Sequence, residues 1–148
     1  MANALYDKGR NAFARGDILW KATGGSTIRA LLVDAAGYTP DLAADELLSA
    51  IPAGARVANG GAQTRAGAPA LTLLDPVAGV CDANDITFTA VSAGGALEYI
   101  VIFRDDGVAD ASSPLIALID TATGLPVTPG GGNITVAWDD GANKIFKL

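Results

Sequence analysis

The chain has 148 residues, which is enough for one domain with a core of its own, and half of these residues are apolar. Its formal net charge of −6 lacks the basic footprint that nucleic acid or an anionic membrane surface attracts. The longest apolar runs are far below membrane-spanning length, no signal peptide is recognisable, and the single cysteine, Cys81, excludes an internal disulfide framework. We therefore expect one soluble domain over residues 1–148, made in the cytoplasm, that binds neither nucleic acid nor a membrane.

The N-terminal segment predicts a short helix over Asn3–Arg15, within an N-terminal helix and arm of residues 1–20. Asn3 is placed to cap the first turn, and Gly16 stands where a C-terminal glycine belongs. Gly9 costs about 1 kcal/mol of helix stability relative to alanine, so the helix must dock on its own sheet or on a neighbouring subunit. The candidate partner contacts of this segment are Leu5, Tyr6, Phe13 and Trp20.

Strands are predicted through the first half of the chain wherever apolar residues are dense. Residues 27–34 (TIRALLVD) have the composition of a strand that is covered on both faces. Residues 42–50 offer a second short helix, which Pro52 ends. Residues 56–58 follow as a strand, and residues 59–70 as a long loop that is rich in glycine and alanine.

The middle of the chain predicts further short strands. Residues 71–74 and 77–80 flank Asp75-Pro76 as two strands or one broken strand. Residues 86–91 (ITFTAV) alternate, with positions 86, 88 and 90 on one face and positions 87, 89 and 91 on the other. Residues 96–104 contain four consecutive large apolar side chains, which favours a central strand.

The last third of the chain predicts three strands, over residues 114–120, 133–138 and 144–148. Asp140-Gly141 is a strong signal for a two-residue hairpin turn between the last two strands. That turn would place Val136 opposite Ile145 and Trp138 opposite Asn143. Together these elements predict a mainly β protein: an antiparallel β-sandwich or jelly roll with a short N-terminal helix and one further short helix.

Catalytic and metal chemistry has few of its usual parts in this sequence. The chain has no histidine, so it has no Ser-His-Asp or Cys-His arrangement and no histidine ligand for a metal. One cysteine cannot build a thiolate zinc site, and Gly130–Gly132 lacks the Gly-Lys-Ser/Thr ending of a phosphate loop. We expect no catalytic residues, no cofactor and no enzyme activity. A hydrolase built only from carboxylates stays open as an alternative, with Asp105/Asp106 and Asp139/Asp140 as its obvious pairs.

Two binding alternatives remain open from the residues alone. Oxygen-rich turns could meet around a calcium ion, although none has the ordered EF-hand spacing. The residues concerned are Asp82, Asn84, Asp85, Asp105, Asp106, Asp139 and Asp140. Aspartate before glycine is also the ordinary residue of a turn. Trp20 and Trp138 could stack on a carbohydrate, but tryptophan more often packs in a core or between strands.

Several segments resemble a family of small structural proteins of tailed bacteriophages. They are MANALYDKGRNAF at the start, IPAGARVA and ITFTAVS in the middle, and SPLIALIDTATGLPVTPGGGNITVAWDDGANKIFKL at the end. The chain is similar to the capsid decoration, or cement, proteins of this group, including the jelly-roll type found on a Bordetella short-tailed phage. The resemblance is densest over residues 113–148 and sparsest over residues 58–74.

This resemblance implies a virion protein on the capsid exterior, with the major capsid protein and further copies of itself, as a dimer or trimer, as partners. Bridging of neighbouring capsid subunits would then stabilise the shell. The net negative charge suits the outside of a particle better than a surface that lines packaged DNA. A second hypothesis is a binding module at the virion surface, tail or fibre that recognises a host glycan.

Overall fold

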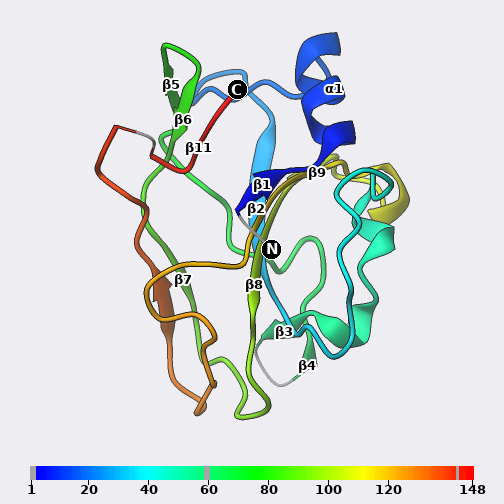
Figure 1. The fold of residues 1–148 in the computed structure, drawn as a ribbon, viewed down its shortest axis with the longest axis vertical. Coiled ribbons are helices and arrows are strands. Elements are labelled where there is room, and N and C mark those ends of the chain that lie inside the picture. The colour runs from blue at the N-terminus through cyan, green and yellow to red at the C-terminus, as the bar shows by residue number, and fades with distance from the viewer. Residues whose placement is uncertain (1–2, 59–60, 143) are drawn as a thin grey trace.

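A four-stranded antiparallel sheet, in the order β1-β9-β8-β2, forms the centre of the molecule (Figure 1). The structure is a computed structural model that describes residues 3–58, 61–142 and 144–148. The strands of this sheet are β1 (Ala4–Leu5), β2 (Thr27–Val33), β8 (Tyr99–Asp105) and β9 (Leu115–Ile119). The prediction of a mainly β, antiparallel sandwich with a short N-terminal helix is therefore confirmed, with its central strands where the apolar runs placed them.

The central sheet is buried on both faces, which is why its strands are apolar runs and do not alternate with polar residues. On β2, Ala30 and Leu32 face one core cluster, whereas Leu31 and Val33 face another. On β8, Ile100 and Ile102 likewise separate from Val101 and Phe103. Side chains on both faces of the central sheet are therefore packed in a core, and both cores hold its strands in position.

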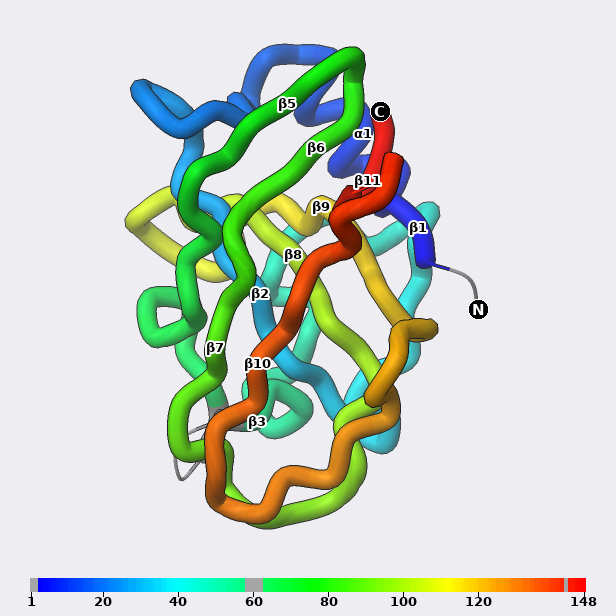
Figure 2. Tube along the Cα trace, turned by 90° about the vertical axis from the view of Figure 1, so that its left-hand side faces the viewer, coloured from blue at the N-terminus to red at the C-terminus, as the bar shows by residue number. Residues whose placement is uncertain are grey.

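The first face is covered by two small sheets, which form the second layer of the sandwich (Figure 2). One pairs β7 (Ile86–Phe88) with β10 (Ile134–Val136), and the other has the order β11-β6-β5. The strands of the second small sheet are β5 (Asp75–Val77), β6 (Val80–Asp82) and β11 (Phe146–Lys147). Phe88, Cys81 and Trp138 from this layer share a core cluster with Ile100 and Ile102.

The second face is covered by segments without long strands. Two of them are the 3-10 turns η1 (Leu48–Ala50) and η2 (Ala53–Ala55). Beside these turns lie the short strand pair β3 (Val57–Ala58) and β4 (Gly61–Ala62) and a third 3-10 turn, η3 (Asp110–Ser112). Strand β3 falls within the predicted strand 56–58, and β4 within the predicted loop 59–70, of which residues 59 and 60 lie outside the described residues.

Of the helix predicted over residues 42–50, only the 3-10 turn η1 (Leu48–Ala50) at its end is formed. The Asp41 carboxylate accepts hydrogen bonds from the backbone N–H groups of Ala43 and Ala44, which closes a local turn instead of a helix. The backbone that follows then pairs with the central sheet, because the Glu46 carbonyl accepts from the Leu115 N–H and Leu47 forms a bridge to Pro114.

Helix α1 (Asp7–Arg15) begins four residues later than predicted, because Ala4 and Leu5 pair with β9 as strand β1. Asn3 does not cap the helix; its side-chain oxygen instead accepts from the N–H groups of Asp120 and Thr121. Gly16 ends α1 in the left-handed conformation (φ 80°), as predicted. The helix docks on its own sheet.

Gly9 makes that docking possible. A Cβ atom at this position would lie 2.5 Å from the Leu115 carbonyl oxygen and 3.1 Å from the Ile116 Cα. Any side chain would push α1 away from β9, so the cost of glycine in the helix is offset by close packing.

The predicted C-terminal hairpin is wrong. Strand β10 pairs with β7, where Val136 stands opposite Ile86, and β11 pairs with β6, where Phe146 stands opposite Cys81. The Asp139 carboxylate, and not a two-residue hairpin loop, organises the turn by accepting from the Gly141 N–H. The predicted partner of Trp138, residue 143, lies outside the described residues. Asp140-Gly141 correctly indicated a turn. The strands on either side of it, however, pair with β7 and β6 and not with each other.

Two further details differ from the sequence prediction. The strands predicted at residues 71–74 and 77–80 are displaced to β5 and β6, which join at Ala78-Gly79 with φ values of 54° and 79°, the signature of a type I′ hairpin turn. The alternation of residues 86–91 holds to Phe88 and then breaks, because Ala90 takes a positive φ of 47°. Val91 is consequently buried and Ala90 exposed.

Candidate interaction surface

The four candidate contact residues of the N-terminal segment divide into two pairs. Tyr6 is fully buried and Trp20 is 5% exposed, so both pack inside the chain's own core. Leu5 is largely buried and Phe13 half-buried, but both reach the wall of a groove at the end of α1. Only the second pair is placed where a partner could touch it.

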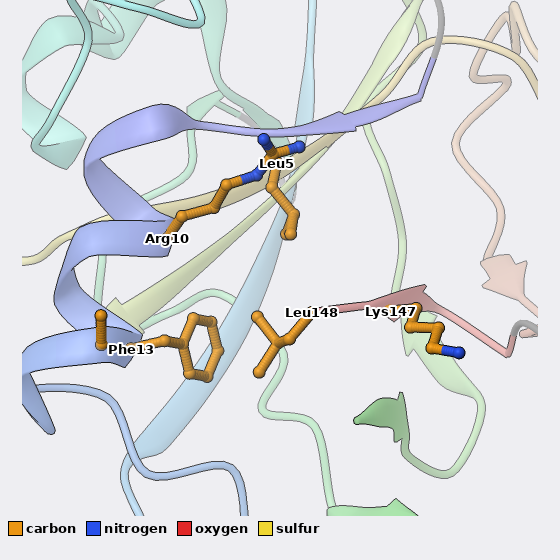
Figure 3. A pocket seen from close by; sticks show the side chains of 6 residues that line it. Leu5, Arg10, Phe13, Lys147 and Leu148 are labelled. Carbon is orange, nitrogen blue, oxygen red and sulfur yellow. The ribbon is translucent and has the colours of Figure 1, made fainter. Parts of the chain in front are cut away.

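This groove, which we call the α1–β11 groove, runs between α1 and β11 and has a volume of about 480 Å³. Its lining consists of Leu5, Arg10, Phe13, Ala14, Lys147 and Leu148. In Figure 3, Phe13 and Leu148 face each other across the groove, the Arg10 guanidinium lies beside Leu5, and the Lys147 ammonium points away. The wall is apolar, with a cationic group at its rim.

The groove continues as a second hollow of about 230 Å³ between the edge strands β1 and β11. Leu5, Arg10 and Lys147 belong to both hollows, and the segment Ala117–Ile119 of β9 lines the second. The two sheets of the sandwich therefore separate at this seam.

Strand β11 is held in place by its one inward-facing aromatic ring. The Phe146 ring meets Trp20 edge to face at 5.1 Å and Phe13 at 6.1 Å, both measured between ring centroids. The Leu148 N–H donates to the Gly79 carbonyl of the neighbouring hairpin. These contacts fix the far wall of the groove without filling it.

The β5–β6 hairpin stands beside the groove with apolar side chains in solvent. Every residue of β5 is exposed, Val77 is 65% exposed, and Leu73, just before the strand, is 64% exposed. The partner strand β6 is anchored by Cys81, which is fully buried. Burial raises the pKa of the Cys81 thiol to about 11, so it is protonated at neutral pH and packs as a small apolar side chain.

Four of the candidate calcium ligands line one hollow, but the described residues contain no group of three or more acidic, histidine or cysteine side chains placed to hold a metal. The four are Asp82, Asn84, Asp85 and Asp140. The Asp106 carboxylate accepts from Ser113 and from the backbone N–H groups of Val108 and Ala109. Hydrogen bonds from the Ser112 side chain and the Val108 N–H hold the pKa of Asp106 well below its usual range. Asp106 is a turn residue.

The remaining acidic candidates also serve structure. Asp85 accepts from the Trp138 N–H, and the Asn84 carbonyl accepts from the Trp138 indole. The Lys144 ammonium lies 3.3 Å from Asp82 and 3.8 Å from Asp140. These contacts tie the end of β10 to the loop after β6.

A network of ion pairs, which sequence reasoning missed, lies on the second face of the central sheet. Asp105, at the end of β8, pairs with both Arg29 and Arg65. Arg56 is 3% exposed and donates to Asp110 and to the carbonyls of Leu48 and Ile51. The network joins β8, η3 and the segment around β3. No sequence motif predicts it, because the two residues of most of its ion pairs are 40 or more positions apart in the sequence.

Neither tryptophan offers a platform for a sugar ring. Trp20 and Trp138 are 5% and 9% exposed, and each indole N–H donates to a backbone carbonyl, of Asp82 and Asn84 respectively. Both are cross-layer packing residues. Stacking on a carbohydrate would need one exposed ring face.

A buried hydrogen-bonded chain explains the position of Tyr6. Its hydroxyl lies 3.0 Å from the Tyr38 hydroxyl, which donates to Asp45 at 2.6 Å. Burial raises the pKa of both phenols above the usual range, so both stay neutral. Tyr6 therefore fastens the start of α1 to the segment that covers the second face.

No protein-family model matches this chain, and no curated protein sequence matches it. Among the described residues, no helix has the length and apolar character needed to cross a membrane.

Proposed function

We propose that this protein is a virion structural protein of a tailed bacteriophage: a capsid decoration, or cement, protein that binds the outside of the head. It bridges adjacent major capsid subunits and raises the force needed to separate them. The sequence resemblance described above suggests this role, and the properties of the molecule support it.

The observation that carries the proposal is the contrast between a body buried on both faces of its central sheet and an apolar surface left exposed at one end. The strands β2, β8 and β9 are almost wholly buried, whereas Leu73, Val77 and Leu148 are more than half exposed. A rigid body with a localised apolar surface suits a protein whose task is to hold other proteins together.

Charge and copy number fit the same role. A net charge of −6 repels packaged DNA and suits the outside of a shell. A lattice of many copies also gains strength from multivalency, so no single contact has to be tight.

The proposal is tested on particles assembled with and without this protein. Particles that lack it should rupture at lower temperature or under milder osmotic shock, and adding the purified chain back should restore their resistance. Equal resistance of the two kinds of particle, measured by release of packaged DNA, would contradict the cement role.

A glycan-binding module at the virion surface is the competing function. Two buried tryptophans give it no support from aromatic stacking. Binding of the purified chain to host surface polysaccharide, with no effect on particle stability, would favour that function over the cement role.

A further inference from the structure

We propose that the α1–β11 groove and the β5–β6 hairpin form one self-association surface, in which the hairpin of one copy enters the groove of a second copy. The proposal concerns the chain alone and does not rest on the capsid role. The occupant of the groove is a second copy of this chain.

Most of the exposed large apolar side chains lie near one small sheet. Five large apolar residues of the described chain are exposed: Leu19, Leu73, Val77, Val108 and Leu148. Three of them, Leu73, Val77 and Leu148, lie on or beside the β11-β6-β5 sheet. Large apolar side chains gathered in this way usually mark a contact surface.

The hairpin and the groove lie at the same end of the molecule. Figures 1 and 2 both show α1, β11 and the β5–β6 hairpin at that end. Strand β11 forms the groove wall, and β5 is the opposite edge of the same small sheet. A copy related by a two-fold axis can therefore place its hairpin in this groove while its own groove receives this hairpin.

Strand β5 is suited to make contact through its side chains and not through its backbone. Val77 and Val80 flank the two-residue turn and form the hydrogen-bonded pair. Pro76, one position further, therefore turns its nitrogen toward the free edge, where it offers no N–H. This edge resists addition of another strand, which leaves insertion of side chains such as Val77 as the mode of binding.

The charges of the groove and of the hairpin are complementary. In a chain of net charge −6, the groove rim carries the Arg10 guanidinium, whereas the Lys147 ammonium points away from the groove. The nearest carboxylate of the described residues to Arg10 is that of Asp7, an exposed contact of 4.0 Å that is worth little. Asp75 is exposed on the hairpin, next to the apolar residues that would fill the groove. The hairpin therefore presents apolar side chains and an acidic one to a groove with an apolar wall and a basic rim.

The test is sedimentation velocity of the purified chain from micromolar to millimolar concentration. We expect a concentration-dependent dimer. Val77→Glu should raise its dissociation constant by about tenfold or more, because a charge would enter an apolar groove. Val108→Glu is the matched control: Val108 is 79% exposed but outside the groove and the hairpin, so this variant should dimerise as the original chain does.

A charge exchange tests the pairing itself. Asp75→Arg and Arg10→Glu should each weaken the dimer alone, and an equimolar mixture of the two variants should recover it as a heterodimer, because both contacts are then attractive. Unchanged thermal unfolding of each variant verifies its fold.

Three results would overturn the proposal. They are a monomer at every concentration, an equal effect of Val77→Glu and Val108→Glu, and a charge-exchange mixture that stays as weak as its components. A monomer that still protects capsids would leave the cement role standing and assign the groove to another protein.

Discussion

The central sheet and the β11-β6-β5 sheet are both antiparallel, and both contain valine, but they use their apolar side chains differently. In the central sheet, Val101 is fully buried in the core cluster on the second face of the sheet. In the small sheet, Val77 has the same side chain and is 65% exposed. The comparison separates apolar residues that specify the fold from apolar residues that remain for a partner.

The end of β8 offers the largest expected effect on the central sheet. Asp105→Asn removes the charge that balances Arg29 and Arg65, and breaking a buried ion pair from one side leaves the other charge uncompensated. We expect a loss of about 3 kcal/mol in the free energy of unfolding, measured by urea denaturation.

Its sequence neighbour is the matched control. Asp106→Asn keeps a side-chain oxygen that can accept from Val108 and Ala109, and position 106 is more open to solvent. This variant should lose less stability than Asp105→Asn. Equal losses would mean that the network around Asp105 does not hold the sheet end together.

The two valines test the comparison directly with one chemical change. Val101→Ala removes two methyl groups from a filled core and should cost about 2 kcal/mol of unfolding free energy. Val77→Ala removes the same groups from solvent and should change it by less than about 0.5 kcal/mol. Urea denaturation at low protein concentration measures both free energies. Similar losses of unfolding free energy for the two variants would mean that Val77 belongs to the core of the fold, which would contradict the difference drawn between the two sheets.

The pH dependence at Asp106 gives the smallest expected effect. Its folded pKa lies below the ordinary value, so its charge stabilises the fold above about pH 4 and this contribution fades as the pH falls toward the folded pKa. The stability difference between the chain and Asp106→Asn should therefore be larger at pH 7 than at pH 3. A difference that grows toward low pH would have the wrong sign for this cause.

Sequence reasoning located what local patterns determine. The apolar runs at residues 27–34, 96–104 and 114–120 became β2, β8 and β9, because a strand covered on both faces must be apolar along its whole length. Gly16 was also recognised, since a helix end commonly requires a left-handed residue.

Sequence reasoning failed where distant segments compete for a strand. Nothing in residues 133–148 says that β10 prefers β7 and β11 prefers β6, so the strong turn signal at Asp140-Gly141 predicted the wrong partners. The α1–β11 groove could not be predicted for the same reason, because Leu5 and Leu148, which both line it, come from opposite ends of the chain. The sequence predicts Leu5 and Phe13 as contact residues, but it gives no such signal for the hairpin beside them.

The most direct test of the proposed function is a cryo-EM reconstruction of intact virions that locates this chain and counts its copies. The account predicts hundreds of copies on the outside of the head, each touching more than one major capsid subunit. A few copies at a single vertex, or at the tail, would contradict it.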